Sequence, residues 1–98
     1  MSAETLELSD AAAADLDAIS QYTFETFGLE QADAYTSDLV SAMRRAARHP
    51  EAGVRSDLAP AGVRRLVSGR HVIYYRPTRR GVFILRILHV RMDPSGRL

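Results

Sequence analysis

Arginine is the residue type that gives this sequence most of its chemical potential. All thirteen basic residues of the 98-residue chain are arginine. A guanidinium group presents a rigid fork of N–H donors that matches carboxylate and phosphate oxygens. Six arginines lie on or beside three apolar segments in the second half of the chain: Arg64, Arg65, Arg70, Arg76, Arg86 and Arg91. Two interpretations of this half of the chain follow: it faces an anionic partner, or the acidic residues elsewhere in the chain neutralise it.

Arg86 stands apart because it interrupts an otherwise apolar run. A charge in such a run costs free energy unless it is paired or faces a partner. One interpretation is a salt bridge to an acid of the helical layer, either Asp57 or a residue of the first predicted helix; the other is a contact with a binding partner. Since side chains alternate along a strand, Arg86 is expected on the opposite sheet face from His89 and Arg91.

The other polar residues form no recognisable catalytic or metal-binding motif. His49, His71 and His89 are isolated, and none lies in an HExxH pattern. The chain has no cysteine, which excludes thiolate zinc sites and a cysteine nucleophile. The six glycines never have the spacing of a phosphate loop or a dinucleotide fingerprint. The sequence therefore predicts no catalytic residue, no metal and no cofactor.

The elements that would position these residues begin with a short strand and two helices. Thr5-Leu6-Glu7-Leu8 alternates apolar and polar side chains, as a half-buried strand does. Ser9 is a suitable N-cap for a first helix, which should end at Gly28. A second helix over 30–48 should end before Pro50, which cannot continue it. The two would form an antiparallel hairpin. The residues expected in the core or between the helices include Tyr22, Tyr35 and Met43.

Three strands are predicted in the second half, over 63–67, 71–76 and 82–90. Segment 51–62 shows little periodicity and is expected to be a surface loop. The strand over 82–90 is apolar at seven of nine positions, so it should be covered on both faces. Tyr74 and Tyr75 should point to opposite faces, one into the core and one at the sheet surface. The β-α-α-β-β-β order predicts an α+β fold, a helical hairpin packed on a mainly antiparallel four-stranded sheet.

Composition and charge indicate what kind of protein this is and what kind of partner it has. With 46% hydrophobic and 26% charged residues, the chain is typical of a globular protein, and we expect one domain over residues 1–98. No membrane span and no secretory signal is apparent, so a cytoplasmic location without membrane contact is expected. Residues 1–43 carry nine acidic and no basic residues, whereas 44–98 carry thirteen arginines and three acids. Either the second half meets an anionic partner, or an acidic helical layer neutralises a basic sheet.

Several segments resemble the ParE toxins of the RelE/ParE superfamily of bacterial type II toxin–antitoxin systems. The two most specific are Ser68–Arg76 and Ile87–Asp93, because helix periodicity alone would not fix His71 with Arg76, or His89 with Met92-Asp93. Further segments that carry the resemblance are Leu8-Ser9, Ala14-Asp15-Leu16, Phe27-Gly28, Gln31-Ala32, His49-Pro50 and Gly62-Val63-Arg64.

The resemblance implies a growth-inhibiting toxin that stalls DNA gyrase on broken DNA. Its partner would be a ParD-like antitoxin, which binds operator DNA through a ribbon-helix-helix domain and forms a hetero-oligomer with the toxin. The antitoxin would wrap an acidic, amphipathic C-terminal segment around the toxin, so the toxin would reach operator DNA only indirectly.

The resemblance also leaves two alternatives. RelE-like relatives cut mRNA in the ribosomal A site with arginine or lysine and a tyrosine, histidine or glutamate. This sequence has no lysine, and no tyrosine or histidine follows Asp93, although His89 with Arg64 or Arg65 would supply part of such a site. The other alternative is a degenerate, non-toxic member that acts only in operon repression.

A toxin that works by binding should use a surface, and two sets of residues are predicted to form it. For target binding and toxicity these are Arg76, Arg86, His89, Arg91 and Met92. For antitoxin binding they are Tyr35, Leu39, Met43, Ile73 and Tyr75.

Overall fold

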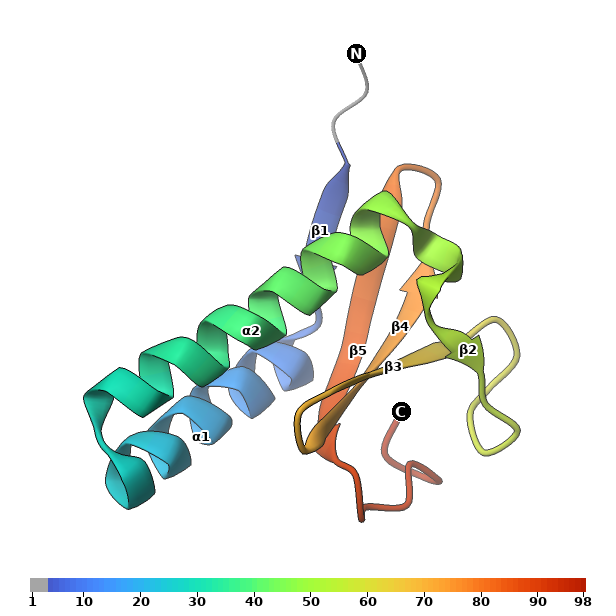
Figure 1. Ribbon diagram of the computed structural model, residues 1–98. Helices are drawn as coiled ribbons and strands as arrows, with labels where there is room; N and C mark the ends of the chain where they lie inside the picture. Colours follow the sequence, from blue (N-terminus) through green and yellow to red (C-terminus); the bar gives the residue numbers. More distant parts are fainter. Residues whose placement is uncertain (1–3) are drawn as a thin grey trace.

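The computed structural model describes residues 4–98, a helical hairpin packed on one face of a five-stranded sheet (Figure 1). In chain order the elements are β1 (Thr5–Leu8), α1 (Asp10–Phe27), α2 (Leu29–Arg48), the 3₁₀ turn η1 (Pro50–Ala52), β2 (Val54–Arg55), β3 (Arg64–Ser68), β4 (His71–Pro77) and β5 (Gly81–His89). The predicted α+β class is confirmed. Over residues 4–98, no helix has the length and apolar character needed to cross a membrane.

The sheet has the order β1-β5-β4-β3-β2, with one more strand than predicted. All neighbours are antiparallel except β1 and β5, which run parallel with Thr5 opposite Gly81. The additional strand, β2, lies inside the segment 51–62 that was expected to be a loop, and it pairs with the start of β3. Two residues are too few to show a strand periodicity, which is why sequence patterning missed it.

Caps at both ends of α1 set the geometry of the hairpin. The Ser9 hydroxyl accepts a hydrogen bond from the Ala12 backbone N–H at 2.9 Å, which confirms the predicted N-cap. Gly28 then adopts φ +94°, a left-handed conformation that favours glycine, and α2 begins at the next residue. The turn is therefore tight, and the helices return side by side along the sheet (Figure 1).

Side chains are packed on both faces of the sheet. On the helical face, α2 buries Leu39 and Met43 against Ile73, Tyr75 and Ile84 of the sheet. On the other face a second cluster is covered by the 59–63 loop and the C-terminal residue; it comprises Val63, Val72, Tyr74 and Leu88 with Ala59, Leu85 and Leu98. The internal strand β5 contributes to both clusters, as predicted.

The second cluster also corrects the expectation for the tyrosine pair. Tyr74 and Tyr75 do belong to opposite faces, but their exposed fractions are only 3% and 0%. The face expected to be open is covered by residues that sequence periodicity could not assign to it.

Where β1 ends, the edge of β5 is completed by side chains of the N-cap residue and the second turn of α1. β1 pairs with β5 only as far as Leu8, opposite Ile84. Beyond that point the Ser9 hydroxyl donates to the Leu85 carbonyl at 2.7 Å, and the Asp15 carboxylate accepts from the Ile87 N–H at 2.9 Å. Because β1 does not pair with this part of β5, these bonds provide partners for backbone groups of β5 that would otherwise have none. The first helix is thereby fixed to the sheet.

Candidate functional site

A groove with a volume of about 670 Å³ lies between the helical hairpin and one end of the sheet. Its helical wall comes mainly from α1, and its other wall from the β3–β4 turn and the end of β5. The lining residues are Ala18, Ile19, Tyr22, Thr23, Phe27, Gln31, Tyr35, Gly69, Arg70, His71 and His89. In Figure 1 the tip of the hairpin projects well beyond the sheet, so the distal parts of α1 and α2 have no strand beneath them.

The polar part of this groove is a connected set of hydrogen bonds around Tyr35. Its hydroxyl accepts from the Arg70 backbone N–H at 3.0 Å and lies 2.6 Å from Nδ1 of His71. Gly69, at φ +59°, brings the turn so close that a Cβ there would lie 2.8 Å from the tyrosine ring. Tyr35 therefore joins α2 to the β3–β4 turn.

His71 and His89 are opposite one another on β4 and β5, and their rings meet edge to face with centroids 5.6 Å apart. Burial, then repulsion from His89, lowers the pKa of His71 below its ordinary value of 6.5, and Asp15 partly opposes this. The lowered pKa favours the neutral form of His71. The donor in its hydrogen bond with Tyr35 depends on the ring tautomer, because the Tyr35 hydroxyl also lies 3.5 Å from the Ser68 carbonyl.

The residues predicted for target binding separate into three places. His89, Arg91 and Met92 lie together at the end of β5: the Arg91 N–H donates to Nδ1 of His89 at 3.2 Å, and Met92 is 43% exposed. Arg76 is exposed at the opposite end of the sheet, because β4 and β5 are antiparallel.

Arg86 forms a salt bridge with the first helix. Its Nε and Nη2 donate to the two Asp15 oxygens at 2.7 and 2.8 Å, and its Nη1 donates to the Arg97 carbonyl at 3.1 Å. The prediction of a partner in the first helix is confirmed, and Asp57 is not that partner. The side-chain hydrogen bond to Asp15 raises the pKa of Arg86.

Four of the five predicted antitoxin contacts are core residues. Leu39, Met43, Ile73 and Tyr75 have exposed fractions of 0–1%, so their side chains offer no surface to a partner in this structure. Tyr35 is half-buried and lines the groove. Direct antitoxin contact by the four buried residues stays a prediction, and it would require the core to open.

A group of exposed apolar side chains lies at the tip of the hairpin, outside both predicted binding sets. Tyr22, expected in the core or between the helices, is 66% exposed, and Phe27 and Leu29 are 62% and 63% exposed. A signal was present in the sequence: Tyr22 and Phe24 are two residues apart, so a helix places them on different faces and cannot bury both against one sheet. Phe24 is 49% exposed.

Comparisons with known proteins agree on one family. Residues 6–94 match the family model described as the ParE toxin of the type II toxin–antitoxin system, parDE. The chain is 40% identical over 92 residues to Toxin ParE1 of Mycobacterium tuberculosis (strain ATCC 25618 / H37Rv), covering 93% of this chain and 94% of that protein. It is 41% identical over 91 residues to Toxin ParE1 of Caulobacter vibrioides, with the same coverage of both chains.

A solved structure described as the chromosomal ParDE TA system from P. aeruginosa has a similar fold. The TM-score is 0.76 at 28% sequence identity, and the match covers 90% of this chain and 97% of that one.

Proposed function

The chain belongs to the ParE toxin family of type II toxin–antitoxin systems, and on that premise we propose that it inhibits growth by binding DNA gyrase in the cytoplasm and is neutralised by a ParD-like antitoxin. The observation that supports the proposal is that one residue, His89, belongs both to the groove and to the surface at the end of β5. His89 lines the groove and also accepts the backbone hydrogen bond of Arg91, next to exposed Met92. A partner bound in the groove would therefore lie against the surface predicted to meet the target.

The antitoxin is proposed to bind through the groove and the hairpin tip. Tyr22, Phe27 and Leu29 are each more than 60% exposed, and contiguous exposed apolar side chains on a small protein are typical of an interaction site. An amphipathic segment would place its apolar side chains between Tyr22 and Phe27. Of the residues predicted from sequence, Tyr35 would touch it directly. Leu39, Met43, Ile73 and Tyr75 would hold the walls in place. Operator DNA would be reached only through the antitoxin.

The gyrase contact is proposed at the end of β5, through His89, Arg91 and Met92. Arg91 is exposed and carries the positive charge that suits a complex of gyrase with DNA. Arg76 would contribute from the opposite end of the sheet. Arg86 would act by holding the C-terminal residues, because it donates to the Arg97 carbonyl.

Gyrase inhibition by binding is proposed in preference to mRNA cleavage because Tyr35 and His71, the tyrosine and histidine at the centre of the groove, are already hydrogen-bonded to each other. The Tyr35 hydroxyl is engaged with both His71 and the Arg70 N–H. A general acid or base must instead be within reach of the substrate's proton. This engagement supports a structural role for the Tyr35–His71 pair.

The first experiment incubates antitoxin-free toxin with gyrase, relaxed plasmid and ATP, and follows supercoiling and linear DNA. Loss of supercoiling with linear DNA, reversed by antitoxin, supports the proposal. A parallel incubation with translating ribosomes and mRNA is the decisive contrast, since mRNA cut only in the presence of ribosomes would replace gyrase as the target. A protein inactive in both assays, and harmless when expressed alone, would be the degenerate, repression-only member.

A matched pair of variants tests the groove. Phe27→Ala removes a groove residue, whereas Phe24→Ala removes an exposed phenylalanine of the same helix that does not line it. We expect Phe27→Ala to weaken antitoxin binding about tenfold or more, in line with the loss of a well-packed aromatic contact, and Phe24→Ala to leave it unchanged. Equal affinities for both variants, measured by calorimetry, would place the antitoxin elsewhere.

A further inference from the structure

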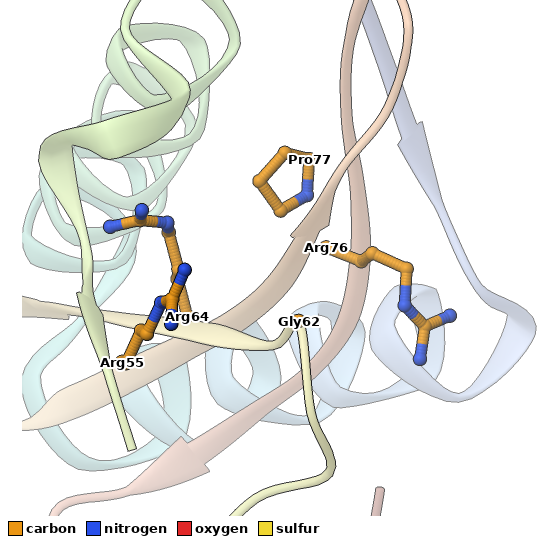
Figure 2. A pocket seen from close by; sticks show the side chains of 5 residues that line it. All are labelled: Arg55, Gly62, Arg64, Arg76 and Pro77. Carbon is orange, nitrogen blue, oxygen red and sulfur yellow. The ribbon is translucent and has the colours of Figure 1, made fainter.

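Two arginines lie directly opposite one another where β2 pairs with β3. Arg55 is the cross-strand partner of Arg64, and like charges placed opposite each other on neighbouring strands destabilise the pair. Figure 2 shows their side chains running alongside one another, while the side chain of Arg76 points away from both. The arrangement is unfavourable by itself and becomes favourable when an anion lies between the two guanidinium groups.

A pocket with a volume of about 300 Å³ lies beside this pair, lined by Arg55, Gly62, Arg64, Arg76 and Pro77 (Figure 2). That volume is at the lower end of the range for small-ligand sites. Gly62 forms part of the rim at φ +85°, and a Cβ there would meet nothing within 4 Å, so the rim is open. The pocket therefore has room for a small charged group beside the two guanidinium groups.

The guanidinium of Arg64 is held in position before any ligand binds. Its Nη1 donates to the Gly53 carbonyl at 2.7 Å. The Gly53 N–H in turn donates to the Tyr75 hydroxyl at 2.8 Å, and that hydroxyl donates to the Pro50 carbonyl at 2.6 Å. A Cβ at Gly53 would lie 2.7 Å from the Tyr75 ring, so this segment is tightly packed. Arg64 thus has a fixed direction, which lowers the cost of ordering it on binding.

The pair has no counterion within the part of the chain that the structure describes. There the salt bridge is between Arg86 and Asp15, far along β5. Glu51 is near enough to Tyr75 to influence its titration, yet it forms no salt bridge with Arg64. Arg79 and Arg80, in the β4–β5 turn, lie at the same end of the sheet.

We propose that Arg55 and Arg64 bind a backbone phosphate of DNA. Arginine forks pair with phosphate oxygens through two N–H donors at once. The series of arginines at this end of the sheet fits a polymer with a charge at every repeat, which favours nucleic acid over a single carboxylate. The inference deepens the proposed function and relies on it only for the biological setting: the toxin would touch the DNA that gyrase holds, as well as the enzyme.

The test measures binding of a short fluorescein-labelled DNA duplex by anisotropy over a series of salt concentrations. Each phosphate contact contributes about 0.9 to the slope of log affinity against log salt. Because both arginines bind the same phosphate, Arg55→Ala with Arg64→Ala should remove that one contact and reduce the slope by about 0.9. The matched control is Arg44→Ala with Arg45→Ala, two exposed arginines of α2 that line neither pocket, and it should keep the wild-type slope. Arg55→Ala alone breaks no hydrogen bond to Gly53, so it guards against misfolding. It should weaken DNA binding relative to the control variant and reduce the slope by less than the double variant does.

Three results would overturn the inference. The first is an equal loss of slope in the pocket and control variants. The second is absence of DNA binding by the wild-type protein. The third is tighter binding of poly-L-glutamate than of DNA with the same dependence on Arg55, which would identify the site as a receptor for acidic peptide. The gyrase assay described above is run in the same way on the wild-type protein and on Arg55→Ala. A wild-type protein that does not inhibit gyrase would remove the proposed function, whereas a failed DNA-binding result alone would leave that function intact.

Discussion

Replacing Asp15 tests whether one carboxylate fixes the first helix to the sheet. It accepts three hydrogen bonds: from Arg86 Nε at 2.7 Å, from Arg86 Nη2 at 2.8 Å and from the Ile87 backbone N–H at 2.9 Å. Asp15→Ala leaves the backbone N–H of Ile87, a residue that is 97% buried, without an acceptor. This lowers the free energy of unfolding by about 1–3 kcal/mol. It also unpairs Arg86. With side chains 26% and 15% exposed, this pair lies between a surface and a buried ion pair, so we assign its loss about 1–2 kcal/mol.

The expected total is a loss of about 2–5 kcal/mol in the free energy of unfolding, a large part of the roughly 5–15 kcal/mol of a typical domain. Urea unfolding followed by far-UV circular dichroism measures it. Asp15→Asn keeps an acceptor for the amide and should lose about half as much. Asp17→Ala, an exposed aspartate of the same helix, should stay within about 0.5 kcal/mol of the wild type. If Asp15→Ala costs no more than Asp17→Ala, the carboxylate does not have the structural role assigned to it.

Three further predictions address other contacts. Tyr75→Phe removes a hydroxyl that both accepts and donates a backbone hydrogen bond before β2, and should lower the unfolding free energy by about 1–3 kcal/mol in urea titration. Because the folded pKa of His71 lies below its unfolded value of 6.5, the unfolded state takes up the proton first, so stability should fall as pH drops below 6.5. Thermal unfolding at a series of pH values should show a smaller drop in His71→Gln than in the wild type, and an equal drop would contradict this role of His71. Gly69→Ala and Gly28→Ala both place a Cβ at positive φ, but only at Gly69 would it lie 2.8 Å from the Tyr35 ring, so Gly69→Ala should have the lower melting temperature; equal values would contradict that packing.

Local pattern was sufficient for the helices and long strands. Ser9 and Gly28 are the residue types that begin and end helices, and the structure places both helix boundaries next to them. The two-residue strand β2 could not be predicted, because its pairing depends on β3 and not on its own sequence. Burial on the second face of the sheet could not be predicted for a similar reason, since Leu98 covers that face only once the chain has folded.

The site was harder to predict because it forms between distant segments. Sequence reasoning identified His89, Arg91 and Met92 through the family resemblance, and the structure brings them together, but their role in target binding remains a prediction. It could not show that α2 turns Leu39 and Met43 fully inward. Amphipathic periodicity says which residues share a helix face, but it does not say how far the sheet extends beneath that face. The exposure of Tyr22 and Phe27 follows from that extent.

The parallel pairing of β1 with β5 has a consequence for synthesis on the ribosome. Thr5 pairs with Gly81, so β1 cannot pair until β5 has been synthesised. At elongation rates of about 5–20 residues per second, the 76 positions by which Gly81 follows Thr5 correspond to roughly 4–15 s of translation. During that interval α1 can form, but the Leu85 and Ile87 backbone groups that Ser9 and Asp15 bind have not yet been made. The hairpin is therefore synthesised long before it can be fixed to a sheet, and a chain cut short before β5 leaves β1 without a partner. The molecule can assemble its surface at the end of β5 only when its sequence is almost complete.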